Sequence, residues 1–179
     1  MKLRDWAGWE KPIFSPLRDP SRDVIKAYQD AARHLDALQE WVYIEAGLIH
    51  TAKHIHNLAH WMPQQFDKFG DMLHENHLMV EYPATPEFPH EYADMDEVFE
   101  SAINLLDEIQ GALFRFRAAA ETKPSTLPMA LFAENLMQEA SAKRTRITEM
   151  WQMYDDPDVG PSSFDNWVMH LTDEKEDDD

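Results

Sequence analysis

Apolar side chains in this sequence recur every three or four residues over long stretches, and this spacing is the feature that most limits its fold. One such stripe runs from Val24 to Ile49, and another runs from Met95 to Phe116. Residues at this spacing share one face of an α-helix, whereas alternate residues share a face of a β-strand. The chain has only 5 glycines among 179 residues, and strand-like alternation of Val, Ile and Thr is hard to find. The sequence therefore predicts an all-α fold, an up-down four-helix bundle.

Prolines and turn-forming residues set the predicted limits of the helices. Gly47 is where the first and longest helix would kink, and Pro63 would stop or bend it. Further prolines at positions 83, 86 and 89 would enforce an extended connection before the third helix. We expect the four helices to cover residues 21–61, 64–80, 92–121 and 126–154.

The two ends of the chain differ in residue composition from the middle. Residues 1–20 hold prolines and aromatic residues, and we expect an extended N-terminal arm there. The bundle would then occupy residues 21–156, and residues 157–179 would form a C-terminal tail that ends in an acidic run. We expect the last seven residues of this tail to be disordered and solvated.

Charge and composition exclude several classes of function. The chain carries 34 acidic and 16 basic side chains, for a formal net charge of −18, so it repels phosphate backbones and attracts cations. It has no cysteine, which excludes disulfides and thiolate ligands. We find no candidate membrane span and no signal peptide, and we expect a cytoplasmic protein. Simple solubility is an equally good explanation of the acidic surface.

Histidines are concentrated in one part of the chain. Seven of the nine lie between His50 and His90. His56 and His60 are four residues apart, a spacing that brings two imidazoles to one side of a helix, as metal binding requires. Extending the first apolar stripe leads to both, and His77 lies on the corresponding stripe of the second helix. We therefore expect these three histidines to point into the bundle.

Carboxylates accompany these histidines. Asp71 and His74 are three residues apart, and Glu75 adjoins His74. Histidine with carboxylate, and without thiolate, suits iron, manganese or zinc. The candidate metal ligands are His56, His60, Asp71, His74, Glu75 and His77. The alternative is that these are ordinary histidines of a packed core.

The stretch from His56 through His60-Trp61, followed by Phe66, Phe69 and Leu73-His74-Glu75, resembles the ferritin-like superfamily. Within it, the similarity is closest to the Dps-like mini-ferritins. The resemblance implies a homo-oligomer in which iron lies between two-fold-related subunits, held by histidines and carboxylates of the first two helices. His60 and His74 would match the family's metal histidines, although they are further apart here than in the family.

The resemblance predicts an iron-binding protein that oxidises and sequesters Fe(II) at His/carboxylate sites, with non-haem iron as the metal. Whether it would act as a ferroxidase-type enzyme stays open. A second hypothesis belongs to another class, a non-catalytic structural or partner-binding bundle without a working metal site. A third, a di-metal oxidase or hydroxylase, is weakened because the fourth helix lacks a second carboxylate-x-x-His motif.

Overall fold

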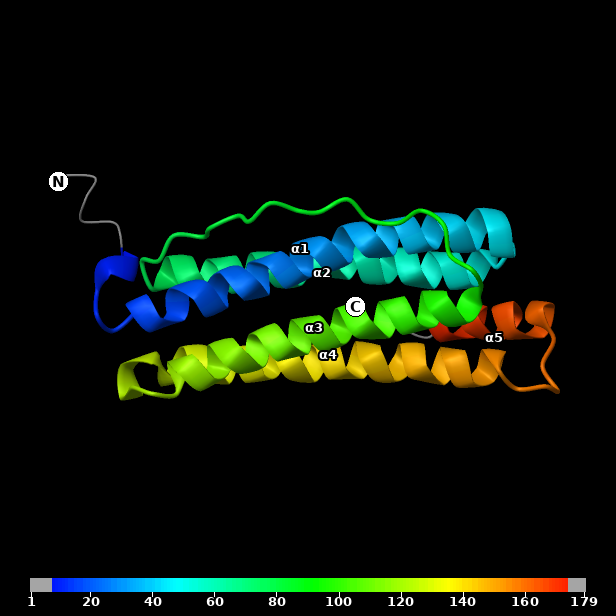
Figure 1. The fold of residues 1–179 in the computed structure, drawn as a ribbon. Helices are drawn as coiled ribbons and strands as arrows, with labels where there is room; N and C mark the ends of the chain where they lie inside the picture. The colour runs from blue at the N-terminus through cyan, green and yellow to red at the C-terminus, as the bar shows by residue number, and fades with distance from the viewer. Residues whose placement is uncertain (1–7, 174–179) are drawn as a thin grey trace.

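The computed structural model describes residues 8–173, and these residues form an all-helical fold. Four long helices lie side by side in Figure 1, with a shorter helix, α5, beside one end. The described backbone contains no strand. The all-α prediction is confirmed, and the arrangement is compatible with a four-helix bundle. The helices are α1 (Arg18–Trp41), α2 (Ile49–Glu75), α3 (Met95–Ala120), α4 (Leu127–Tyr154) and α5 (Pro161–Asp173).

Both predicted end segments contain helical structure. Two short 3-10 turns, η2 (Gly8–Glu10) and η3 (Ser15–Leu17), precede α1, so residues 8–20 are not an extended arm. α5 occupies more than half of the predicted tail and packs against α2. Of the last seven residues, for which we predicted disorder, Asp173 ends α5 and residues 174–179 lie outside the described residues, as do residues 1–7.

The chain reverses at Gly47 and Leu48, inside the segment that we predicted as one helix. α1 continues past Trp41 as a π-helical turn, η4 (Val42–Ala46). Gly47 then takes a left-handed conformation, with φ of 66°, and its N–H donates to the carbonyl of Val42. Glycine adopts this conformation without the steric clash of a Cβ atom. The predicted helix over residues 21–61 is therefore wrong, because α1 and α2 form an antiparallel pair (Figure 1).

Pro63 lies inside α2, where we predicted the end of a helix. Proline in a helix interior removes one hydrogen bond and typically costs about 3 kcal/mol. The Pro63 ring is exposed, whereas Ile55, Met62 and Phe69 of the same helix are buried. Burying apolar side chains of this size contributes about 1.5–3 kcal/mol each, which offsets the cost of the proline. α2 therefore continues to Glu75.

Residues 76–94 form a long connection that returns along the whole bundle before α3 begins (Figure 1). α2 and α3 consequently run in the same direction, which differs from the simple up-down order that we predicted. The connection is held at its start by the indole of Trp9, which donates to the carbonyl of Met79 at 2.8 Å. Further on, the Arg18 guanidinium pairs with Glu81 at 2.6 Å.

α3 and α4 follow the predicted limits closely. The side chain of Asp94 accepts from the Glu97 N–H at 3.0 Å, and the Glu97 carboxylate accepts from the Ala93 N–H at 2.6 Å. The first bond is an N-cap bond, and the second joins the Glu97 carboxylate to the residue before the N-cap, so together they fix the start of α3. The predicted helices over residues 92–121 and 126–154 are confirmed within a few residues.

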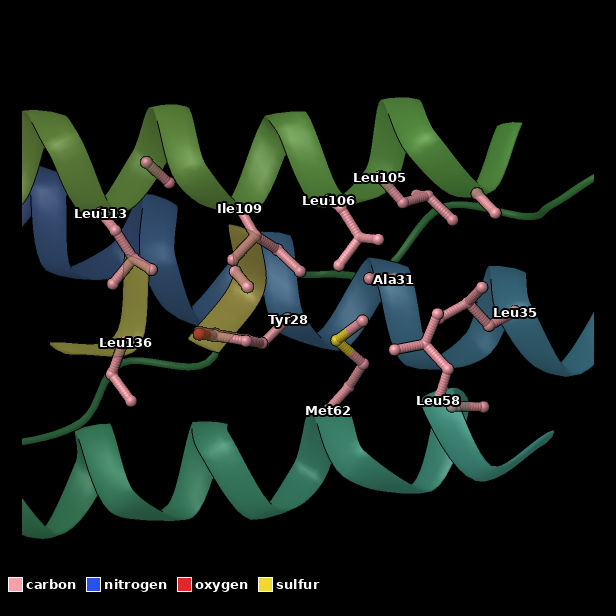
Figure 2. Packing of buried hydrophobic residues seen from close by; sticks show 14 of the residues in the cluster. Tyr28, Ala31, Leu35, Leu58, Met62, Leu105, Leu106, Ile109, Leu113 and Leu136 are labelled. Atoms are coloured by element: carbon pink, nitrogen blue, oxygen red, sulfur yellow. The ribbon is translucent and has the colours of Figure 1, made fainter. Parts of the chain in front are cut away.

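The centre of the bundle is filled by apolar side chains from all four long helices. Figure 2 shows Tyr28 of α1, Met62 of α2, Ile109 of α3 and Leu136 of α4 converging there. All four are buried. Within residues 8–173, no helix combines the length and the apolar character that a membrane span requires.

α5 stabilises the start of α2. The carboxylate of Asp165 accepts hydrogen bonds from the backbone N–H groups of His50, at 3.1 Å, and Thr51, at 2.9 Å. It also accepts from the Thr51 hydroxyl at 2.8 Å. The first N–H groups of a helix have no partner within the helix, and negative charge is favourable at this end. Asp165 therefore caps α2 from a distant part of the chain.

We expect Asp165→Ala to lower the free energy of unfolding by about 1–2 kcal/mol, the usual cost of removing a helix cap. Urea unfolding followed by circular dichroism would measure this loss. Asn166→Ala, at the next and exposed position, is the control. Equal losses in the two variants would contradict the capping role.

Candidate metal site

The predicted metal ligands lie on the outside of the bundle. His56, His60, Asp71, His74 and Glu75 are all on α2, and each is exposed. The expectation that His56 and His60 point inward is wrong. The reversal at Gly47 breaks the register, so the apolar stripe of α1 does not continue into α2.

His56 and His60 are nevertheless close together. Their ring centroids are 4.3 Å apart, and the two ring planes make an angle of 65°. Both rings are on the solvent side of α2, so an ion could reach them without any rearrangement of the core. The i, i+4 spacing thus provides two neighbouring imidazoles for one metal ion.

The remaining predicted ligands cannot join this pair within one chain. His60 and His74 are on the same helix, and at 1.5 Å per residue they are separated by about 21 Å along its axis. Asp71 and Glu75 lie near His74, in the last turns of α2. Nowhere in residues 8–173 do three or more His, Asp or Glu side chains gather so that they could hold one ion.

His77 has a structural role that explains its position. We predicted it on the inner stripe of a helix, but α2 ends at Glu75 and His77 is exposed. Its φ is 58°, in the left-handed region. Its N–H donates to the His74 carbonyl, and the N–H of Leu78 donates to the Leu73 carbonyl, both at 2.9 Å. These two bonds form a Schellman motif, with His77 in the position that glycine usually occupies.

The bundle interior offers no metal ligands in place of the predicted ones. Metal sites inside ferritin-like bundles use inward carboxylates and histidines, but the buried polar residues of the described part are Ser21, Thr51, Gln65 and Thr126. The hydroxyl of Tyr28 is buried near the centre and has no hydrogen-bond partner. Burial, together with the charge of Glu139, raises the pKa of this hydroxyl, so it stays protonated.

The structure also shows a groove between α1 and α3 that the sequence did not reveal, with a volume of about 660 Å³. Its carboxylates are largely neutralised by neighbouring cations. Asp30 pairs with Lys26, and Asp107 receives the Arg144 guanidinium at 2.6 Å. Asp23 is 3.3 Å from Arg115. A groove lined by such ion pairs is a poor metal site, because its carboxylates already have partners.

His34 is a further residue that sequence reasoning missed. It stacks on Phe88 of the long connection, with ring centroids 5.0 Å apart, and on Tyr92 at 6.2 Å. Its Nε2 atom is buried without a hydrogen-bond partner, and burial lowers the pKa of the imidazole. His34 therefore holds the connection against α1. In the sequence, His34 directly precedes Leu35, which belongs to the apolar stripe of α1, and this position could have indicated that His34 contacts the core.

Comparison with known proteins does not give this arrangement of residues a function. No protein-family model matches the chain, and no curated protein matches it. The geometry of the chain itself therefore has to support any functional proposal.

We expect His77→Gly to raise the free energy of unfolding by about 0.5–1 kcal/mol, because glycine avoids the strain of a left-handed conformation. His77→Val should lower it, because a β-branched residue tolerates this conformation poorly. Urea unfolding would measure both variants. If glycine destabilised the protein as much as valine, the assignment of His77 to the helix end would be wrong.

His34 should make stability depend on pH. Because its pKa is lowered in the folded state, the unfolded chain takes up a proton more readily than the native protein. Neutral His34 makes its full contribution to the free energy of unfolding above the pKa of a histidine in the unfolded chain, about 6.5. This contribution is lost as the pH falls through the lower pKa that His34 has in the folded protein. The stability advantage of wild type over His34→Phe should therefore shrink from pH 7.5 to pH 5. A constant difference across urea titrations would contradict this, and His90→Phe, at an exposed histidine, is the control.

Proposed function

We propose that this chain is a ferritin-like protein that binds iron at His56 and His60 and that oxidises and sequesters Fe(II). The observation that carries the proposal is the exposed histidine pair, whose ring centroids are 4.3 Å apart on α2. Two imidazoles at this spacing can bind one divalent transition metal, and nitrogen with oxygen donors suits iron.

The order of the helices supports the ferritin-like part of the proposal. Ferritin-like bundles contain one long crossover connection between two pairs of helices. Residues 76–94 form a connection of this kind, with α2 and α3 running in the same direction (Figure 1). The short α5 is an addition to this plan. Because the interior is apolar, the proposal assigns the metal to the outer surface of α2.

The charge of the chain supports a cation as substrate. A formal net charge of −18 raises the local concentration of Fe(II) near the surface. In the oxidation step each Fe(II) ion would give one electron to dioxygen, which takes up protons from solvent. The chain would supply the ligands for this step.

The alternative is a structural or partner-binding bundle without a metal site. Tyr43 and Ile44, in the turn between α1 and α2, favour it because these apolar side chains are 57% and 70% exposed. Large exposed apolar side chains that lie together can mark a protein interface. This alternative expects no metal affinity and an unrelated protein as partner.

Metal binding to a purified, untagged chain would test the proposal. We expect His56→Ala/His60→Ala to abolish rapid Fe(II) oxidation in air. The double variant should also weaken Fe(II) binding under nitrogen by more than roughly 10–100-fold, the loss of metal affinity that follows when a partner of a ligand, rather than the ligand itself, is changed. His74→Ala/His90→Ala removes two other exposed histidines and should leave both properties unchanged. A wild-type chain that binds no Fe(II), and oxidises it no faster than buffer does, would exclude the proposal.

A further inference from the structure

The long connection between α2 and α3 has a proline at every third position, at Pro83, Pro86 and Pro89. Proline fixes its own φ near −65°, and it holds the residue before it in an extended conformation. These restrictions apply to six of the eight residues 82–89. The backbone from residue 78 to residue 92 accordingly contains no turn, bend or strand. This combination favours a polyproline II helix, which has three residues per turn and therefore three edges.

The burial of the side chains follows the same period of three. Tyr82, Thr85 and Phe88 form the edge that faces the bundle. The ring of Tyr82 lies 5.8 Å from that of Phe66 in α2, and Phe88 stacks on His34 of α1 at 5.0 Å, both measured between ring centroids. Thr85, between them, is half-buried. One edge of the polyproline II segment is therefore fixed to the helices.

The other two edges face solvent. Pro86 and Pro89, which we call the proline ridge, are exposed, and so are Ala84, Glu87 and His90 on the third edge. Figure 1 shows the connection on the outside of the bundle along its whole length. A domain that reads polyproline II docks prolines of such a segment into an aromatic-lined groove. The face between the two exposed edges is thus open to a groove of this kind.

The backbone of the segment is also available to a partner. From residue 80 to residue 88 no backbone N–H or carbonyl forms a hydrogen bond in the structure, as expected for polyproline II. Its carbonyls can therefore accept bonds from a docked domain. An extended chain can alternatively dock by adding a strand to a sheet, but proline has no N–H to donate to a neighbouring strand. The proline ridge consequently favours polyproline II recognition.

Contacts at both ends hold the segment in place before any partner arrives. Glu81 pairs with Arg18 at 2.6 Å and with Arg22 at 3.3 Å. At the other end, the Tyr92 hydroxyl donates to the Pro89 carbonyl at 2.9 Å. A segment that is already ordered loses little conformational freedom on binding, which increases its affinity for a partner.

The charge of the connection indicates which groove would fit it. Residues 76–94 contain four carboxylates and neither lysine nor arginine. Glu87 lies beside the proline ridge and Glu91 follows it, and both are exposed. Complementary charge across an interface speeds association and excludes wrong partners. A matching groove would therefore carry lysine or arginine at its rim.

We infer that the proline ridge is a docking surface for a protein domain whose aromatic-lined groove reads polyproline II and whose rim is basic. The bundle serves as the scaffold that presents this segment in a fixed conformation. The inference does not depend on iron binding, because the proline ridge and the histidine pair belong to different segments of the chain.

Binding to purified domains tests this inference. The probes are four polyproline-II-binding domains, an SH3 and a WW domain with a basic groove rim and one of each with an acidic rim. We expect the intact chain to bind the basic-rimmed domains in isothermal titration, and Pro86→Ala/Pro89→Ala to weaken this binding about tenfold or more, as loss of a central anchor does. Circular dichroism should show unchanged helicity. Pro16→Ala/Pro157→Ala removes two exposed prolines elsewhere and should bind as wild type.

A charge reversal tests the electrostatic part without altering the prolines. Glu87→Lys should weaken binding to the basic-rimmed domains and strengthen binding to the acidic-rimmed ones, and added salt should reduce both effects. If none of the four domains binds the wild type, or if the proline variant binds as tightly as the wild type, the inference is wrong. Preference of the wild type for acidic rims would also overturn it. Self-association of the wild type that the proline variant loses would assign the ridge to a second copy instead.

Discussion

The reversal of the chain at Gly47 determines how the rest of the molecule is arranged. A left-handed residue ends the helical path there, and the π-helical turn before it lets both Gly47 and Leu48 donate to the Val42 carbonyl. The N–H groups that the turn leaves at the start of α2 are satisfied by Asp165 of α5. One tight turn therefore links three helices, and it decides which side of α2 faces the core.

Because α3 runs in the same direction as α2, the chain returns along the whole bundle between them (Figure 1). The N-terminal residues help to hold this connection. A Cβ atom on Gly8 would lie 2.5 Å from the carbonyl oxygen of His77, so only glycine allows this close approach. The left-handed turn at His77 and the docking of Trp9 on Met79 thus fix the connection where it leaves α2. Its far end is held by rings that stack on His34.

Sequence patterns predicted the helical class and the limits of α3 and α4, because α3 has an uninterrupted apolar face and a short turn containing Pro124 separates the two helices. They failed at Gly47, since Val42, Ala46 and Ile49 keep a helical spacing across a turn that only one glycine signals. They also failed at Pro63, because burial of the opposite face outweighs the cost of proline. The histidine pair was predicted as a pair, but its direction depended on the register that Gly47 interrupts.

The apolar interior limits where metal chemistry could occur. Side chains such as Met62, Ile109 and Leu136 fill the space between the helices (Figure 2), and a carboxylate there would have to lose its hydration. On the outside of α2, by contrast, histidines and aspartates stay hydrated until a ligand arrives. A surface helix presents two neighbouring ligands easily but not four, because its side chains diverge from a convex surface.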